Sequence, residues 1–211
     1  MIVLRNKWEA RPITIHQAKD FVSEFHYAQG GGNVAHACHG LFYKGDSQTL
    51  HGISWWNPPP LGASKSVSED HRAVLSLSRF CLRPDRPDNS GSFLISKSIK
   101  LLDSRWKTLL TYADTIKNHD GGLYRASNWS FHGLTRKNPV YWDPENDCMV
   151  SRKKGKYNFN KTQMIEMGYE YKGSHEKLRF LYQREKRSKL IINSRESDSL
   201  IFTNTGKILK K

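Results

Sequence analysis

Residues 74–102, VLSLSRFCLRPDRPDNSGSFLISKSIKLL, have the pattern of a strand, a turn and a helix in direct succession. Apolar and polar side chains alternate over residues 74–82, which predicts a strand. Residues 83–92 are rich in Pro, Asp, Asn, Gly and Ser, which favour turns. The apolar residues that follow recur at helical spacing, and Asn89 or Ser90 is expected to cap that helix.

The turn between this strand and this helix has the features of a phosphate-binding site. A helix N-terminus presents unpaired N–H groups and the positive end of the helix dipole. Arg83 and Arg86 add positive charge, while Gly91 and Ser92 allow a close approach of the backbone. The spacing matches neither G-x-x-x-x-G-K-[ST] nor G-x-G-x-x-G, which argues against P-loop and Rossmann proteins. A purely structural turn is the alternative, because strand–turn–helix units with glycine are common.

The segments on either side complete an α/β pattern. A helix within residues 12–29, capped by Thr14 and preceded by strand-like residues 13–15, is predicted from helical spacing of Ala18, Phe21, Val22 and Phe25. Further strands are predicted at residues 37–43, 50–56, 109–114 and 178–182, and a short helix at residues 123–129. Residues 61–70, rich in Gly and Ser, are expected to form a mobile surface loop.

The length of 211 residues suits one α/β domain with an appendage. We assign residues 1–183 to the main domain. The chain becomes polar and basic beyond that point, so residues 184–211 are expected to form a basic tail, with one extra strand at residues 189–193.

The net charge favours a polyanionic partner. Lys and Arg number 34 against 20 Asp and Glu, a formal charge of +14. Residues 1–105 carry 13 basic and 9 acidic residues, or +4, whereas residues 106–211 carry 21 and 11, or +10. Such asymmetry predicts a basic patch for a polyanionic partner, with nucleic acid favoured over a membrane, although a solvated basic surface is the alternative. The predicted DNA contacts are Arg152, Lys153, Lys154, Lys156, Arg184, Lys186, Arg187 and Lys189.

The cysteines and the apolar segments indicate a cytoplasmic protein. Cys38, Cys81 and Cys148 are too few and too scattered for a disulfide framework, and none forms C-x-x-C. They are expected to be ordinary buried thiols. No apolar run approaches the ~20 residues of a membrane span, and residues 1–5 lack the features of a signal peptide.

The histidines form a candidate metal site. His26, His36, Cys38 and His39 lie close together in the sequence, and iron could use imidazoles with a carboxylate. However, His36 and His39 flank a predicted strand, where residues three apart point to opposite faces. We therefore predict no metal site, and regard iron as a possibility that the spacing does not support.

Arg79 and Asp114 form another candidate pair. Each is a charged residue within or at the end of an apolar strand, which is unfavourable unless the charge is paired or functional. Neighbouring strands of one sheet could bring the two together. A buried ion pair and a functional pair both remain open.

Several short motifs, in this order, resemble the phage Mom family of DNA adenine-modification proteins. The resemblance covers residues 20–182. The matching stretches are FHY at residues 25–27, LSRFCLRP at 77–84, NSGSFLISK at 89–97, TYADT at 111–115 and GLYRASNW at 122–129.

The resemblance implies an acetyltransferase-like (GNAT-like) fold, a central mixed sheet flanked by helices, for the catalytic domain of residues 1–183. In that fold the turn after the central strand holds the pyrophosphate of acetyl-CoA or another acyl-CoA-type donor. Carried onto this chain, the donor-binding residues are Leu82, Arg83, Arg86, Asn89, Ser90, Gly91 and Ser92. The usual signature Q/R-x-x-G-x-G/A is present only in part, which leaves the donor open.

The resemblance also implies a reaction, the conversion of adenine in phage DNA to an N6-carbamoylmethyl form that resists host restriction. The implied catalytic residues are His26, Tyr27, Arg79, Ser96, Asp114 and Tyr124. Asp114 or His26 could act as general base, and Arg79 could orient Asp114 or a carbonyl group. Tyr124 could protonate a leaving thiolate or stack on a base. Because the amine lies inside a duplex, base flipping is expected.

Two other functions remain open from the sequence. The chain could be an N-acetyltransferase acting on a small amine or protein, with its basicity incidental. It could also be a non-catalytic DNA-binding protein with the same fold. The charge of residues 106–211 favours DNA over a small amine, and Arg79, Asp114 and Tyr124 together favour an enzyme.

Overall fold

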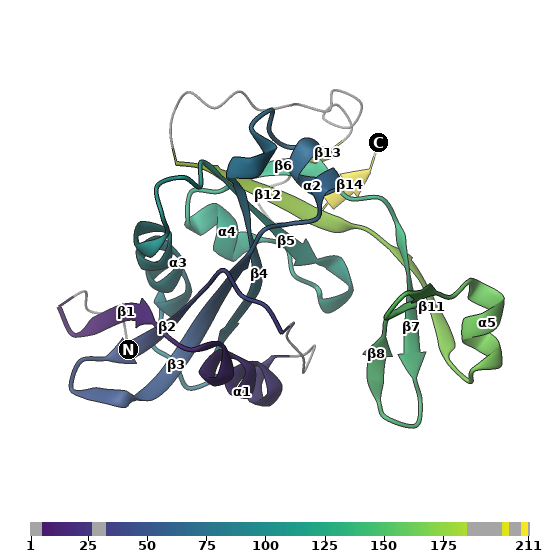
Figure 1. The fold of residues 1–211 in the computed structure, drawn as a ribbon, viewed down its shortest axis with the longest axis horizontal. Helices are drawn as coiled ribbons and strands as arrows, with labels where there is room; N and C mark the ends of the chain where they lie inside the picture. Colours follow the sequence, from purple (N-terminus) through teal and green to yellow (C-terminus); the bar gives the residue numbers. More distant parts are fainter. Residues whose placement is uncertain (1–5, 27–32, 185–199, 203–207, 211) are drawn as a thin grey trace.

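The computed structural model describes residues 6–26, 33–184, 200–202 and 208–210, and its centre is a seven-stranded mixed sheet (Figure 1). The strand order is β1-β2-β3-β4-β5-β12-β6. Neighbours are antiparallel except β4 and β5, which are parallel. The bounds are β1 Trp8–Pro12, β2 Ala37–Tyr43, β3 Asp46–Asn57, β4 Val74–Leu82, β5 Thr108–Asp114, β6 Ser130–Leu134 and β12 Lys177–Gln183.

Helices cover both faces of this sheet, which confirms the predicted fold class. They are α1 Ile15–Phe25, α2 Leu61–Lys65, α3 Ser90–Leu101 and α4 Gly122–Ala126, with 3-10 turns η1 His71–Ala73 and η2 Thr115–Lys117. Successive residues of a strand point to opposite faces. On β3, Ile53 and Trp55 therefore pack with α1, whereas Trp56 packs with α3.

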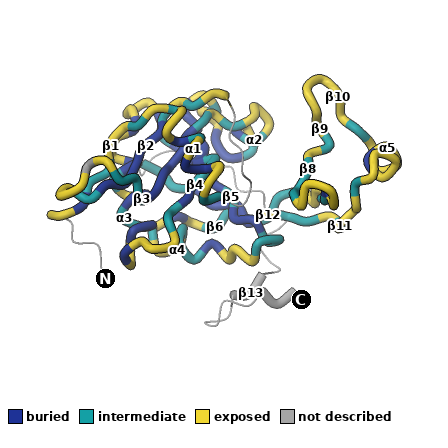
Figure 2. Tube along the Cα trace, turned by 90° about the horizontal axis from the view of Figure 1, so that it is seen from below, coloured by how far each residue is buried: buried dark blue, intermediate teal, exposed yellow. Residues whose placement is uncertain are grey.

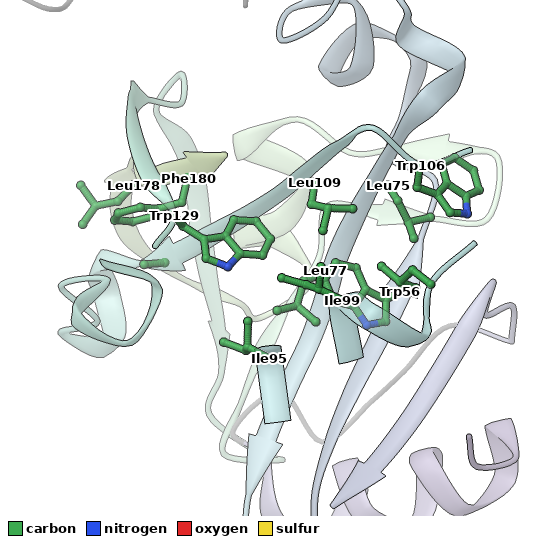
Figure 3. Packing of buried hydrophobic residues seen from close by; sticks show 12 residues of the cluster. Trp56, Leu75, Leu77, Ile95, Ile99, Trp106, Leu109, Trp129, Leu178 and Phe180 are labelled. Carbon is green, nitrogen blue, oxygen red and sulfur yellow. The ribbon is translucent and has the colours of Figure 1, made fainter. Parts of the chain in front are cut away.

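The main apolar core lies on the α3 face of the sheet (Figure 3). It contains Trp56, Leu75, Leu77, Ile95, Ile99, Leu102, Trp106, Leu109, Ala113, Trp129, Leu178 and Phe180. A fully buried large apolar side chain contributes about 1.5–3 kcal/mol. Because the cluster joins residues of β4, β5 and β12, it holds the sheet together beside the place where β4 and β5 begin to part.

A buried polar network on α3 fixes the helix against the sheet. The Ser98 hydroxyl lies 2.6 Å from His39 Nδ1 and 2.8 Å from Ser54 Oγ, and it accepts a hydrogen bond from Trp56 Nε1 at 2.7 Å. Burial lowers the pKa of His39 to about 4, so its ring is neutral at pH 7. Because the His39 ring is neutral, its hydrogen bond with Ser98 does not require burying a charge in the core.

Residues 135–176 form a lobe inserted between the antiparallel neighbours β6 and β12 (Figures 1 and 2). It contains a three-stranded sheet in the order β11-β7-β8, a two-stranded hairpin and a short helix. Their bounds are β7 Asn138–Asp143, β8 Cys148–Val150, β9 Lys153–Lys154, β10 Tyr157–Asn158, α5 Lys161–Glu166 and β11 Glu170–His175. Both views show the lobe standing away from the main sheet.

Most predicted elements are confirmed. The Thr14 cap is part of a capping box with Gln17, and β2 has the predicted bounds. The short strand predicted at residues 13–15 is wrong, because α1 begins at Ile15 and the first described strand is β1. Asn89 is the residue before α3, but its φ of 63° is left-handed and its side chain makes no cap hydrogen bond.

The surface loop predicted at residues 61–70 is also wrong. It contains α2 and three buried residues, Ser64, Val67 and Ser68. Val67 packs against Val74 of β4 and neighbouring buried residues. Apolar contact in the folded chain therefore outweighs the local Gly/Ser composition.

The tail contains an antiparallel pair, β13 Leu200–Phe202 and β14 Ile208–Lys210. The strand predicted at residues 189–193 lies outside the described residues. Within the described part of the chain, no helix is both long enough and apolar enough to span a membrane.

Candidate active site

A cleft opens where β4 and β5 part. The two strands pair at three positions, residues 74–76 with residues 108–110, although β4 continues to Leu82 and β5 to Asp114. The space between them belongs to a cavity of about 650 Å³ that also borders the end of α1 and the β5–α4 loop. Such a volume lies in the range of sites for small molecules.

A bulge in β4 explains the parting. Arg79 pairs with Trp55 and Leu77 with Trp56 of β3, so Ser78 is an extra residue on β4. Bulges bend a strand and increase its twist. The Thr111 hydroxyl of β5 donates to the Leu77 carbonyl at 3.2 Å. The Thr111 side chain thus supplies the hydrogen bond to the Leu77 carbonyl just beyond the last backbone pair between β4 and β5.

The cleft brings together residues that are far apart in the sequence. His26 follows α1, Arg79 lies in β4, Asp114 ends β5 and Tyr124 lies in α4, and all border the same cavity. Ser96 does not join them, because it lies on the exposed side of α3 beside a separate hollow. Tyr27 lies outside the described residues.

His26 is held as a neutral imidazole. It is the C-cap of α1, and its N–H donates to the Val22 carbonyl at 3.0 Å. Burial, together with the neighbouring Arg79 and His119, lowers the pKa of the His26 ring to about 4. A neutral imidazole at pH 7 can accept a proton from a bound substrate.

Asp114 is held by groups outside β5. Its Oδ2 pairs with Lys177 Nζ of β12 at 3.0 Å, and its Oδ1 accepts a hydrogen bond from the Ile116 N–H at 3.2 Å. The Asp114 side chain is 8% exposed and that of Lys177 is 46% exposed. The carboxylate therefore orients the start of the β5–α4 loop.

Arg79 borders the same cavity as Asp114, but the ion pair described for Asp114 is with Lys177. The Arg79 Nη1 donates to the Ser78 carbonyl at 2.8 Å. Because Ser78 is the bulged residue, this hydrogen bond fixes the Arg79 guanidinium to the bent part of β4.

Tyr124 places a phenol at the border of the cleft. Burial raises the pKa of its hydroxyl, and a hydrogen bond with Thr111 only partly opposes this. The ring lies 5.5 Å from the Phe180 ring and 5.9 Å from the Trp129 ring, between centroids. A phenol that stays protonated and is held by aromatic contacts is suited to act as a general acid.

Lys177 and His119 also border the cavity, and the sequence did not single them out. Lys177 lies opposite Asp114 in the β12–β5 register. That pairing joins distant segments, so no local pattern reveals it. His119 follows the short turn η2, where its N–H donates to the Asp114 carbonyl at 3.2 Å.

The turn after β4 is ordered by its own side chains. Arg83 pairs with Asp85 at 3.0 Å, and Arg86 Nη1 donates to the Arg83 carbonyl at 3.2 Å. The Ser90 hydroxyl donates to the Pro87 carbonyl at 2.6 Å.

Gly91 has a packing role in this turn. A Cβ at this position would lie 2.6 Å from Leu123 Cδ1, so the missing side chain admits α4. Leu82 and Arg86 border the cleft, whereas Asn89 and Ser92 border the separate hollow.

That hollow has a volume of about 490 Å³ and runs along α3. Lys97 and Lys100 of α3 and Asn128 of the α4–β6 connection line it together with Ser96. It places two cations along the helix that follows the β4–α3 turn, and Arg86 of that turn borders the cleft.

The histidines considered for iron have structural contacts. His36 Nε2 accepts a hydrogen bond from Trp106 Nε1 at 2.9 Å, and His39 bonds Ser98. Burial raises the pKa of Cys38 to about 11, which keeps the thiol protonated. No group of three or more His, Cys, Asp or Glu suited to a metal ion occurs among the residues that the structure describes.

The predicted DNA contacts fall into separate regions. Arg152, Lys153, Lys154 and Lys156 lie in or beside the β9–β10 hairpin of the lobe. Arg184 instead donates hydrogen bonds to the carbonyls of Leu102, Asp103 and Trp106 at 3.2, 2.6 and 3.2 Å, respectively, which fastens the end of β12 to the α3–β5 connection. Lys186, Arg187 and Lys189 lie outside the described residues.

The sequence matches the Mom protein family over residues 7–198. The chain belongs to the Mom family. A curated relative, the methylcarbamoylase Mom of Escherichia phage Mu, is 30% identical over 122 residues, which make up 55% of this chain and 49% of the relative. This Mom-family chain therefore matches about half the length of that relative.

Solved acetyltransferases are similar to this Mom-family protein at TM-scores below 0.5. The ribosomal-protein-S5-alanine acetyltransferase of Vibrio fischeri has a TM-score of 0.49 at 6% identity, covering 88% of this chain and 98% of that one. A GNAT-family acetyltransferase of Bacillus cereus has a TM-score of 0.44 at 8% identity, covering 85% and 99%.

Proposed function

We propose that this Mom-family protein modifies phage DNA in the host cytoplasm, transferring a small acyl-derived group of the carbamoylmethyl type to the N6 amine of adenine. The cleft between β4 and β5 carries the proposal, because it gathers His26, Arg79, Asp114 and Tyr124 from separate elements. Family membership supports DNA as the substrate, and the name methylcarbamoylase of the phage Mu relative supports the group transferred. Modified adenine would protect the DNA from restriction.

The substrate adenine enters the cleft as a flipped base. Inside a duplex the N6 amine is paired and stacked, so an enzyme must extrude the nucleotide to reach it. The cavity of about 650 Å³ can take a purine together with the reactive end of a donor. The aromatic cluster behind Tyr124 gives the cavity a firm wall.

A donor of the acyl-CoA type fits residues beside the cleft. The Asn89 side chain makes no cap hydrogen bond at the start of α3, which supports the first turn of this helix as a site for a phosphate. Arg86 of the β4–α3 turn borders the cleft, and Lys97 and Lys100 would supply cations for further phosphates in the separate hollow along α3. When bound, such a donor would supply an acyl carbon for the N6 amine and a thiolate leaving group, which gives an N6-acyl adenine; a carbamoylmethyl product requires a further step that adds the amide nitrogen.

The residues of the cleft divide the proton movements between them. His26 accepts the proton that the adenine amine releases, because its pKa of about 4 keeps it neutral at pH 7. Tyr124 donates its proton to the leaving sulfur, and the Arg79 guanidinium binds the carbonyl oxygen. Asp114 acts as a positioning residue through the β5–α4 loop, since both of its oxygens already have partners.

The decisive experiment is nucleoside analysis of plasmid DNA from cells that express the chain. Mass spectrometry should show a modified deoxyadenosine with the parent protein and none with Tyr124→Phe, which deletes one hydroxyl and keeps the ring. Lys44→Gln, an exposed change in the turn between β2 and β3, serves as the matched control. Unmodified DNA with an acetylated small amine or protein would establish the N-acetyltransferase instead.

Calorimetry tests the donor separately. Coenzyme A should bind the parent protein, and Lys97→Gln with Lys100→Gln should weaken that binding because two cations that face the phosphates are removed. Absence of binding to the parent protein would eliminate the acyl-CoA-type donor, whatever the nucleoside analysis shows.

A further inference from the structure

The β9–β10 hairpin of the lobe is an exposed, basic two-stranded ribbon (Figure 2). Residues 151–165 contain five basic residues and no acidic residue. Lys153, Lys154, Lys156 and Tyr157 are all exposed, and Tyr157 retains 58% of its accessible surface. Gly155, with a φ of +59°, makes the tight turn that brings these lysines to the end of the ribbon.

Aromatic rings contact two of these cations, Lys154 and Lys156. Lys154 Nζ lies 4.8 Å from the centroid of the Tyr169 ring and 2.8 Å from its hydroxyl. Lys156 Nζ lies 5.3 Å from the Tyr157 ring centroid. A cation over a ring is attracted by the ring quadrupole, and its side chain has less conformational freedom left to lose on binding.

The rings themselves are stacked beside the cations. Tyr157 and Phe159 have centroids 6.1 Å apart and planes at 22°. Aromatic rings interleaved with lysines offer an apolar contact for sugar or base edges beside charges for phosphates. The ribbon therefore matches the chemistry of a nucleic acid better than that of an acidic protein.

The lobe is rooted at the rim of the cleft. Lys177, which pairs with Asp114, follows the end of β11 by two residues. The chain leaves β8 toward the hairpin at Val150. Val150 pairs with Tyr141 of β7, and Tyr141 pairs in turn with Tyr171 of β11. Lys177 lies six positions after Tyr171, so the chain between them spans at most roughly 20 Å at about 3.3 Å per residue.

We propose that the lobe is a docking arm for duplex DNA, with the β9–β10 hairpin contacting the duplex several base pairs from the base in the cleft. The major groove admits a two-stranded β-ribbon. The arm fixes the position of the duplex while the target nucleotide is extruded. The identity of the base in the cleft rests on the proposed function, whereas the contact with duplex DNA does not.

The first test measures the salt dependence of binding to unmodified duplex DNA. The variant K153Q/K154Q/K156Q removes three charges and keeps most of the side-chain length. The slope of log K against log salt should become shallower by about 2.7, at about 0.9 for each phosphate that is no longer neutralised. K172Q is the matched control, because Lys172 lies in the same lobe but pairs with Glu170 at 2.5 Å. Thermal melts check that both variants fold.

The second test varies the distance between the target adenine and the end of the duplex. Modification by the parent protein should fall when the duplex on one side of the target is shortened to a few base pairs, since the arm then has no duplex to hold. The triple variant should modify long and short duplexes at the same reduced rate. The difference in modification rate between the parent protein and the triple variant should be smaller on single-stranded oligonucleotides than on duplexes.

The outcomes separate the arm from the reaction. An unchanged salt slope in the triple variant overturns the docking arm, even if DNA is modified. A shallower slope in a protein that modifies no adenine supports the arm and refutes the proposed function. Modification that is independent of duplex length refutes the placement of the arm along the DNA axis.

Discussion

Replacing Asp114 by Asn separates the charge of this residue from its hydrogen bonding. The amide keeps the Oδ1 acceptor for the Ile116 N–H but removes the anion that faces Lys177. Replacing Lys177 by Gln removes the other half of the pair. Each variant leaves one charge without its partner. The unpaired charge is more exposed in Asp114→Asn than in Lys177→Gln, because the Lys177 side chain is 46% exposed and the Asp114 side chain 8%.

This difference sets the order of the two effects on stability. Leaving a fully buried charge without its partner costs about 3–5 kcal/mol. Asp114→Asn leaves an ammonium that water can solvate, so we expect a loss of about 1 kcal/mol, as for exposed ion pairs. Lys177→Gln leaves a buried carboxylate, and we expect about 2–3 kcal/mol, reduced from the full value by the Ile116 hydrogen bond and the partial opening of the site.

Urea unfolding and nucleoside analysis test both consequences. Asp114→Asn should lower the modification rate about a hundredfold, a size typical of a reactive group misplaced by about 1 Å. A larger stability loss for Asp114→Asn than for Lys177→Gln would contradict the burial argument. Parental activity in a folded Asp114→Asn protein would sink the positioning role.

The remaining predictions concern the cleft and the buried network. Tyr124→Phe should bind DNA and melt as the parent does but lose about 10²–10⁴-fold in rate, as measured by nucleoside analysis. The pKa of His26 lies below its unfolded value of 6.5, so its contribution to stability is full above pH 6.5 and is lost as the pH falls toward about 4. His26→Gln should flatten this part of a stability–pH curve, and an unchanged curve would exclude the depressed pKa. Ser98→Ala should cost about 1–3 kcal/mol in urea unfolding, because the buried Trp56 N–H is left without its acceptor. Ser96→Ala, on the exposed side of the same helix, should change stability by less than about 0.5 kcal/mol.

The local part of the fold could be predicted from the sequence. The alternation over residues 74–82 gives β4, and the capping pattern of Thr14 and Gln17 gives the start of α1. Each signal depends on neighbouring residues alone. Family motifs placed His26, Arg79, Asp114 and Tyr124 on separate elements, and the parted sheet brings them to one cleft.

The rest depends on contacts between distant segments. Lys177 meets Asp114 only because β12 pairs with β5, and no sequence pattern specifies that register. The bulge at Ser78 is set by two strands together, so alternation along β4 alone does not show it. The strands of the lobe are short, and β11 is irregular between Tyr171 and Ser174, which obscures the alternation that identifies a strand.

The insertion of residues 135–176 between neighbouring strands makes the lobe an exchangeable module. β6 and β12 pair directly. At their junction the Thr135 N–H donates to the Lys177 carbonyl at 3.0 Å, and the Lys177 N–H donates to the Thr135 hydroxyl at 2.9 Å. Topologically, the whole lobe is the loop of one hairpin. Because each doubling of loop length costs only about 0.6 kcal/mol in closure entropy, recombination at this junction can lengthen, shorten or replace the segment without rebuilding the sheet. The lobe can thus change in evolution, and with it the surface that we propose binds DNA, while the cleft between β4 and β5 stays the same.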